Sequence, residues 1–121
     1  METIQIEINN HRKVFAIREF FSNEFKNMKL EFYAKPNTED GTHSEKIVRN
    51  SGFTVGDCRT ENHNGMLVIT PEMTVRVLKD YLRDTFGLKA EVYKLDGSSW
   101  ITTDSDTMSL KEFNALKSIS Q

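Results

Sequence analysis

The hydrophobic and polar residues of the chain alternate in five short stretches. This alternation predicts β-strands that each bury one face. The stretches are Thr3–Ile8, Lys29–Lys35, Met66–Thr70, Leu88–Leu95 and a shorter one that ends at Trp100. Pro36 ends the second stretch, because a proline cannot donate to a strand ladder. The pair Asp96-Gly97 predicts a tight turn that joins the last two strands in a hairpin.

Three other segments repeat their apolar residues at helical spacing. The first helix is predicted from Arg12 to about Phe25, and its apolar face consists of Val14, Ile17, Phe20, Phe21 and Phe25. The second helix is predicted between a Thr74 cap and Gly87, since glycine readily takes the left-handed conformation that ends a helix. Its apolar face consists of Val75, Val77, Leu78, Tyr81, Leu82 and Phe86. Ser109 and Glu112 form a capping-box pattern at the start of a short last helix.

The resulting order, β-α-β-β-α-β-β-α, predicts an α+β fold with a single mixed sheet of about five strands and helices packed on one face. The nearest simple architecture is ferredoxin-like, extended by the last hairpin strand. A β-grasp, ubiquitin-like arrangement is the alternative. With 121 residues, the chain is long enough for one domain, 1–121, with one core.

No periodicity is sustained between about residues 36 and 64. We expect a long, partly mobile loop there, whose second half docks through Phe53 and Val55. The tail, residues 117–121, is expected to fray.

Composition narrows the classes of function. A formal net charge of −2 argues against a general affinity for polyanions. The chain has one cysteine, Cys58, so no internal disulfide can form, which fits a reducing compartment. No apolar run is long enough to span a bilayer, and the N-terminus lacks the continuous apolar segment of a signal peptide. We therefore expect a cytoplasmic protein that does not bind membranes.

Cys58, Arg59 and His63 form the most suggestive cluster for catalysis. An adjacent arginine can lower the pKa of a thiol, and a nearby imidazole can act as its base. A thiol-dependent enzyme or a redox sensor would use these three residues. However, no third orienting residue is evident, and no local signature of a known thiol enzyme surrounds the cysteine. The competing interpretation is a small, buried, apolar cysteine.

The other polar residues point to little further chemistry. The histidines and the cysteine lack metal-binding spacings, and no glycine-rich loop is present, so we expect no metal and no cofactor. Arg76, Lys79 and Arg83 share one face of the second predicted helix and are candidates for weak nucleic-acid binding. Asp80 and Asp84 interrupt this stripe, as is typical of a solvated helix face.

Trp100 and Tyr93 lie on the two strands of the predicted hairpin. Such an aromatic pair either stabilises the sheet or, together with Thr102, offers a surface to a partner. We therefore favour a small non-enzymatic protein-interaction module that binds an unidentified protein partner. Thiol chemistry at Cys58 is the alternative, and weak nucleic-acid binding is a further one. A homodimer is also plausible, since an uncovered edge strand tends to recruit another strand.

Four segments, in their order, resemble a family of short bacterial proteins of unknown function. They are KLEFYAKP (Lys29–Pro36), GDCR (Gly56–Arg59), EMTVRVLKDYLRDTFGLKAEVYKLDGSSWITT (Glu72–Thr103) and SLKEFN (Ser109–Asn114). The chain departs from this family in its Thr/Asn/Glu-rich linker and at Met108, where a tryptophan is expected. The resemblance implies a single compact domain and carries no known activity.

Overall fold

The fold is α+β, as predicted. A computed structural model of the 121-residue chain describes residues 2–34, 47–49, 51–60, 63–103 and 107–116. Within them the elements are β1 (Ile4–Ile8), α1 (Val14–Glu24), β2 (Met28–Phe32), the 3₁₀ helix η1 (Val55–Cys58), β3 (Gly65–Ile69), α2 (Val75–Phe86), β4 (Ala90–Asp96), β5 (Ser99–Ile101) and α3 (Leu110–Ala115).

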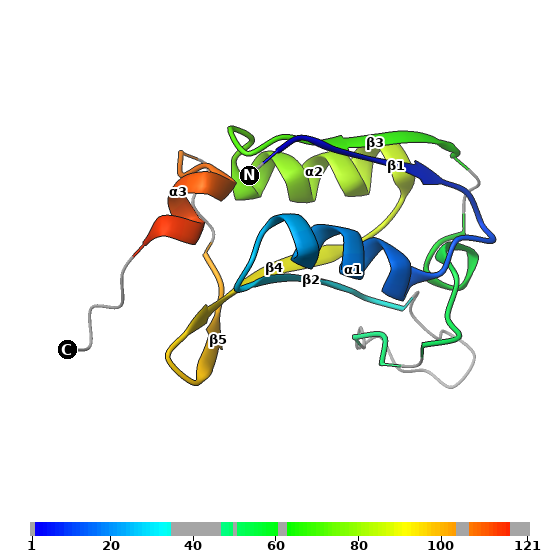
Figure 1. Ribbon diagram of the computed structural model, residues 1–121. Coiled ribbons are helices and arrows are strands. Elements are labelled where there is room, and N and C mark those ends of the chain that lie inside the picture. Colours follow the sequence, from blue (N-terminus) through cyan, green and yellow to red (C-terminus); the bar gives the residue numbers. More distant parts are fainter. Residues whose placement is uncertain (1, 35–46, 50, 61–62, 104–106, 117–121) are drawn as a thin grey trace.

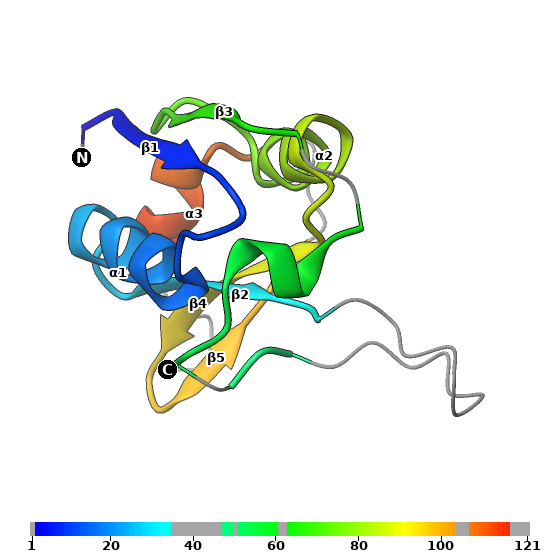
Figure 2. The same cartoon turned by 90° about the vertical axis from the view of Figure 1, so that its right-hand side faces the viewer.

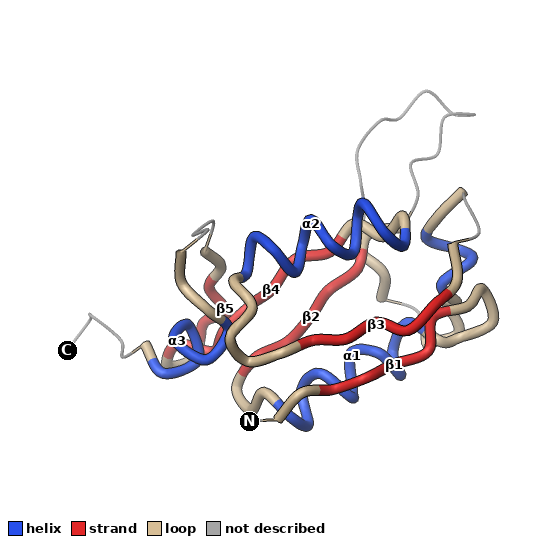
Figure 3. The backbone as a smooth tube through the Cα atoms, turned by 90° about the horizontal axis from the view of Figure 1, so that it is seen from above, coloured by secondary structure: helices blue, strands red, loops and turns tan. Residues whose placement is uncertain are grey.

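The strands form two antiparallel sheets, which corrects the prediction of one five-stranded sheet. β1 pairs with β3, and β2, β4 and β5 form a separate sheet in the order β2-β4-β5. The single sheet of a ferredoxin-like or β-grasp arrangement is therefore not what these strands form. The reason is physical: alternation fixes which face of a strand is buried, but not which strand lies beside it. Figure 3 shows β1 and β3 side by side.

The helices α1 and α2 lie between the two sheets (Figure 1). Seen from the end, the β1-β3 sheet, α2, the β2-β4-β5 sheet and α1 surround the interior as four walls (Figure 2). Side chains from every wall fill this interior. The largest fully buried ones are Phe21, Phe25, Phe32, Phe86, Phe113, Ile6, Ile8, Ile17, Met28, Leu30, Leu67 and Ile69. Burying each contributes about 1.5–3 kcal/mol relative to exposure, so this core dominates the stability.

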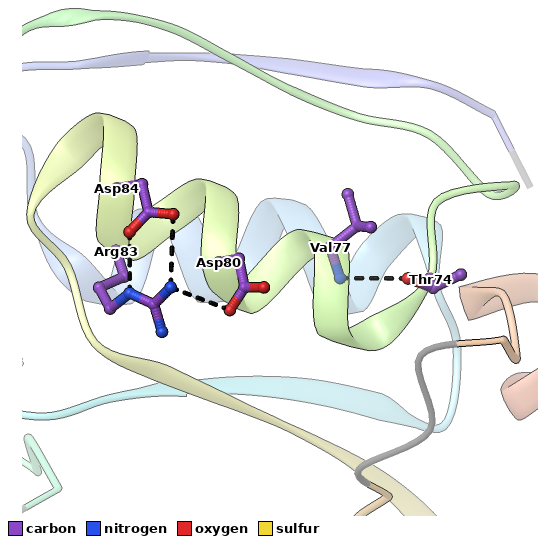
Figure 4. Close-up of polar contacts among 5 residues, drawn as sticks. All are labelled: Thr74, Val77, Asp80, Arg83 and Asp84. Atoms are coloured by element: carbon purple, nitrogen blue, oxygen red, sulfur yellow. Dashed lines mark hydrogen bonds and ion pairs between the residues drawn. The ribbon is translucent and has the colours of Figure 1, made fainter.

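The second helix begins and ends where the sequence predicts. The Thr74 side chain accepts a hydrogen bond from the Val77 N–H at 3.1 Å, and Gly87 ends α2 with φ of 69°. Figure 4 shows the hydrogen bond between the Thr74 side chain and the Val77 N–H. Two residues of the predicted apolar faces are instead half exposed, Phe20 and Val77, each at 49%. Val77 points well away from the buried face of α2, and Phe20 lies outside that of α1. An apolar residue in a helix therefore does not by itself show that its position faces the core.

Part of the predicted long loop is ordered. Val55 is fully buried, Phe53 packs against the core, and the Phe53 carbonyl accepts a hydrogen bond from the Val14 N–H at 3.0 Å. The docking predicted for these two residues is therefore confirmed. The expectations of mobility in the loop fall largely on residues 35–46, 50 and 61–62, and that of a frayed tail falls on 117–121, all outside the described residues.

The N-terminal half (residues 4–58) and the C-terminal half (residues 65–116) have the same succession of elements. Each contains a strand, a helix, a second strand and a short helix, and β1 pairs with β3 and β2 with β4. The C-terminal half also contains β5, which pairs with β4 and has no counterpart among the described residues of the N-terminal half. The residue before each long helix also bridges to the residue before each short helix, Lys13 to Thr54 and Thr74 to Ser109. The two halves are thus related by an approximate two-fold axis through the two sheets.

Candidate interaction surface

The three-stranded sheet has one apolar face and one polar, aromatic face. Met28, Leu30 and Phe32 of β2 and Ala90 and Val92 of β4 belong to the hydrophobic core. The intervening residues lie on the opposite face, which we call the outer face. It comprises Lys29, Glu31, Tyr33, Glu91, Tyr93, Leu95 and Trp100.

Trp100 is the most exposed aromatic residue of the outer face. It is 42% exposed and lies opposite Leu95, so that Tyr93 is a diagonal neighbour. The Lys29 ammonium lies 4.5 Å from the Trp100 ring centroid and 5.3 Å from that of Tyr93. Each such cation–π contact contributes about 0.5–1 kcal/mol at an exposed site. Lys29 therefore holds both rings, while Thr102 lies exposed just beyond β5.

Two glutamates face each other at the centre of the outer face. Glu31 and Glu91 are directly opposite in the β2·β4 pairing, where like charges destabilise a sheet. A cation from each long helix offsets this repulsion. Arg18 of α1 forms an ion pair with Glu31, and Lys79 of α2 lies 3.1 Å from the Glu91 carboxylate.

The carboxylate of Glu31 is almost fully buried, because its residue is only 2% exposed. Arg18 also donates to the Leu30 carbonyl at 3.0 Å, so its guanidinium is fixed at the edge of β2. The centre of the outer face is thus close to neutral and held by charged contacts from both helices.

Tyrosine hydroxyls lie beside this pair of glutamates. Burial raises the pKa of Tyr93, and the proximity of Tyr33 and of both carboxylates, with a hydrogen bond to Tyr33, raises it further. Tyr93 therefore stays protonated at neutral pH and can donate a hydrogen bond. On the other side of the approximate axis, the Lys89 ammonium lies 5.6 Å from the Tyr33 ring centroid, which repeats the contact of Lys29 with Tyr93.

The predicted thiol cluster has a different environment. Cys58 is 5% exposed at the end of η1, whereas His63 is exposed. Arg59 is only 4% exposed, and its burial lowers its pKa. Its guanidinium donates to the Asn10 side chain at 2.9 Å and to the Phe86 carbonyl at 2.9 Å.

Two further bonds of Arg59 reach the segment that links the halves. They go to the His63 carbonyl at 2.7 Å and to the Asn64 side chain at 2.8 Å. All four acceptors are neutral oxygens, from both halves and from their linker. This geometry gives Arg59 a structural role as a clamp. A buried cysteine beside such a clamp is typical of a packed residue, because reactive thiols lie in partly exposed sites.

The predicted basic stripe lines a groove. Arg76, Lys79 and Arg83 of α2 converge with Lys89 around a groove of about 420 Å³, which Asp80 and Ala90 complete. Carboxylates neutralise part of the positive charge of this groove, because the Arg83 guanidinium lies 3.2 Å from the Asp80 carboxylate and 2.9 Å from that of Asp84 (Figure 4). The hydrogen bond from Arg83 lowers the pKa of Asp84. The groove is therefore less positive than its row of cations suggests.

Neither a metal centre nor a membrane span emerges from the part of the chain that the structure describes. Within it, no three His, Cys, Asp or Glu side chains are placed to hold a metal ion. No helix of the same residues is long and apolar enough to cross a membrane.

Comparison with known proteins gives no match: no family model matches the chain, and no curated protein or solved structure matches it. The candidate surface therefore rests on its own geometry. Of its residues, the sequence pointed to Trp100, Tyr93 and Lys79 but not to Lys29, Arg18 or Glu31. A Lys-x-Glu-x-Tyr motif, present at 29–33 and again at 89–93, could have pointed to Lys29 and Glu31, whereas no such signal marks Arg18.

Proposed function

We propose that this protein is a small non-enzymatic interaction module that binds a protein partner through the outer face around Trp100. One observation carries the proposal: a tryptophan is 42% exposed while a lysine is held between its ring and that of Tyr93. Tryptophan and tyrosine are enriched where binding energy concentrates, and their rigid rings lose little entropy on binding.

The chemistry of the outer face suggests what such a partner presents. Glu31 and Glu91 are engaged by Arg18 and Lys79, so the centre offers little free charge. Lys29 adds a positive charge beside the exposed indole. A fitting partner places an apolar group against Trp100 and an acceptor, such as a carboxylate, near Lys29. A cytoplasmic location remains part of this proposal.

Site-specific photo-crosslinking tests the proposal. A benzophenone side chain at position 100 is expected to form adducts with a discrete protein in extracts of the native cells. The matched control carries the same group at position 20, because Phe20 is 49% exposed but lies on α1. Adducts at position 100 that disappear in a Lys29→Glu background support the proposal. Equal adducts at both positions, or none at position 100, contradict it.

Anion binding in the α2 groove is a second candidate function. The favouring observation is that one groove is lined by three cations of α2 and by Lys89, which directly precedes β4. The test is binding of a fluorescent single-stranded oligonucleotide at two salt concentrations. A real polyanion site loses affinity steeply as salt rises, and Arg76→Gln weakens it. Binding that ignores both changes rejects this function. Thiol chemistry at Cys58 remains a third hypothesis, which its burial does not favour.

A further inference from the structure

Aligned positions of the two halves carry similar residues. Val14 and Val75 begin α1 and α2 and lie 61 positions apart. The same spacing separates Phe25, which follows the last residue of α1, from Phe86, the last residue of α2. After the helices the spacing is 60, because Asn27 with φ of 65° corresponds to Gly87 with φ of 69°. The segments NMKLEFY (27–33) and GLKAEVY (87–93) then match position by position.

The strand registers obey the same correspondence. The middle pair of β1·β3 is Ile6 with Leu67, and the middle pair of β2·β4 is Glu31 with Glu91. Each pair joins equivalent positions of the two halves. An antiparallel pairing centred on equivalent residues is what a two-fold axis requires, as in an interface between identical subunits.

Side-chain and main-chain contacts repeat as well. The ion pairs of Arg18 with Glu31 and of Lys79 with Glu91 are equivalent. The Val55 N–H donates to the Arg12 carbonyl at 2.8 Å, and the Leu110 N–H donates to the Met73 carbonyl at 2.8 Å. Even the grooves correspond: Phe15, Arg18, Glu19 and Ser22 line one, and Arg76, Lys79, Asp80 and Arg83 line the other.

We propose that residues 4–58 and 65–116 are two copies of one module, and that the surface each half presents to the other fits the complementary half of a second copy of this chain. The same strand pairs and core contacts form whether the two halves belong to one chain or to two. An exchanged dimer, in which each N-terminal half packs on the partner's C-terminal half, therefore preserves every contact between halves. Exchange of this kind is a low-cost route to dimers.

The linker determines which form predominates. Residues 59–64 join the halves, and a short connection gives each half an effective concentration of about millimolar at the other. Arg59 adds to this preference, because it binds the linker at Asn64 and both halves at Asn10 and the Phe86 carbonyl. The intact chain therefore closes on itself, and exchange becomes visible when intramolecular closure is blocked.

Complementation between two full-length variants tests the inference. Ile17→Asp damages the N-terminal half, and Leu78→Asp damages the C-terminal half at the equivalent position; both side chains are fully buried. Each variant alone is expected to be insoluble. When they are co-expressed with different tags, the two undamaged halves can pair. We expect a soluble complex that carries both tags and has the mass of two chains.

The control replaces one partner with the double variant, Ile17→Asp with Leu78→Asp. Co-expression of this variant with either single variant leaves no complete set of undamaged halves, and no complex is expected. The result that overturns the inference is failure of the two single variants to rescue each other while wild-type chains carrying the same tags remain soluble.

A circular permutant tests equivalence independently of the damaged halves. By the two-fold relation, Cys58 corresponds to Phe113, so the six-residue linker 59–64 corresponds to residues 114–119. A permutant that begins at Gly65, continues through residue 119 directly to Ile4 and ends at Asn64 keeps Arg59 with its four acceptors, and it is expected to fold. Its urea midpoint should lie within about 0.5 M of the wild-type value. An unfolded permutant contradicts the equivalence of the halves.

Discussion

Replacing Arg59 by alanine is expected to lower the free energy of unfolding by about 3 kcal/mol. The guanidinium makes four hydrogen bonds, and each bond to a charged group contributes about 1.5–3 kcal/mol net. The full sum is not lost, because three acceptors are only partly buried and water can replace the donor. The Phe86 carbonyl is buried, and leaving it unsatisfied costs about 1–3 kcal/mol.

Two other variants sharpen this prediction. Arg59→Lys keeps the charge, but an ammonium lacks the planar fork that reaches several acceptors, so we expect roughly half the loss. Arg83→Ala is the matched control, because this side chain is 60% exposed and exposed ion pairs contribute little to stability. Urea unfolding followed by circular dichroism and by the fluorescence of the single tryptophan measures all three. A loss below about 0.5 kcal/mol for Arg59→Ala would refute the clamp.

Three further outcomes follow from the contacts. Arg18→Met leaves the buried carboxylate of Glu31 without its cation and should lower the free energy of unfolding, measured in urea, by about 2–3 kcal/mol, part of which Glu31→Gln should restore. Lys79→Met should lower it by less than about 1 kcal/mol, because the pair with Glu91 is more exposed. Equal losses for the two single variants contradict this. Cys58 should react with a thiol reagent at least about 100-fold more slowly in the folded protein than in urea, and a fast native reaction would instead favour the thiol hypothesis. Tyr93 should have a pKa above the ordinary tyrosine value of about 10, so the stability that it contributes is present below that pH and is lost as pH rises through its folded pKa. In an ultraviolet titration, Tyr93→Phe should remove the tyrosine signal that ionises at the highest pH. A titration in which this signal persists rejects the prediction.

Local signals predicted individual elements well. Thr74 and Gly87 bound α2, and Ser109 with Glu112 forms the capping box that starts α3, because caps depend on a few neighbouring residues. The buried faces of the strands also follow from alternation. The β4-β5 hairpin at Asp96-Gly97 is also as predicted, because a hairpin depends on neighbouring residues. The pairing of β1 with β3 and of β2 with β4 did not follow, because it joins residues about 60 positions apart.

The candidate surface was predictable only in part. Trp100 and Tyr93 stand out as large aromatic residues on a hairpin. Lys29 reads as an ordinary polar strand residue until its ammonium is seen between two rings. Adjacency in the sequence predicts that Arg59 activates Cys58, whereas in the structure its guanidinium donates to four oxygens of other residues. Adjacency in the chain does not give the direction of a long side chain.

The sequences of the two halves have diverged at most aligned positions. Only a few positions are identical, but they include the Lys-x-Glu-x-Tyr motif of the outer face. Along α1 and α2 the halves differ in charge, since Phe15 and Ser22 of one groove correspond to Arg76 and Arg83 of the other. The groove along α2 thus carries two helix cations, Arg76 and Arg83, that its counterpart along α1 lacks.

Strand pairing measured by nuclear magnetic resonance tests the central claim most directly, because the outer face and the two-fold relation both depend on it. Backbone nuclear Overhauser effects should connect β1 with β3 around Ile6 and Leu67, and β2 with β4 around Glu31 and Glu91. Cross-strand effects from β1 to β2 or β4 would mean a single sheet, and would contradict the account.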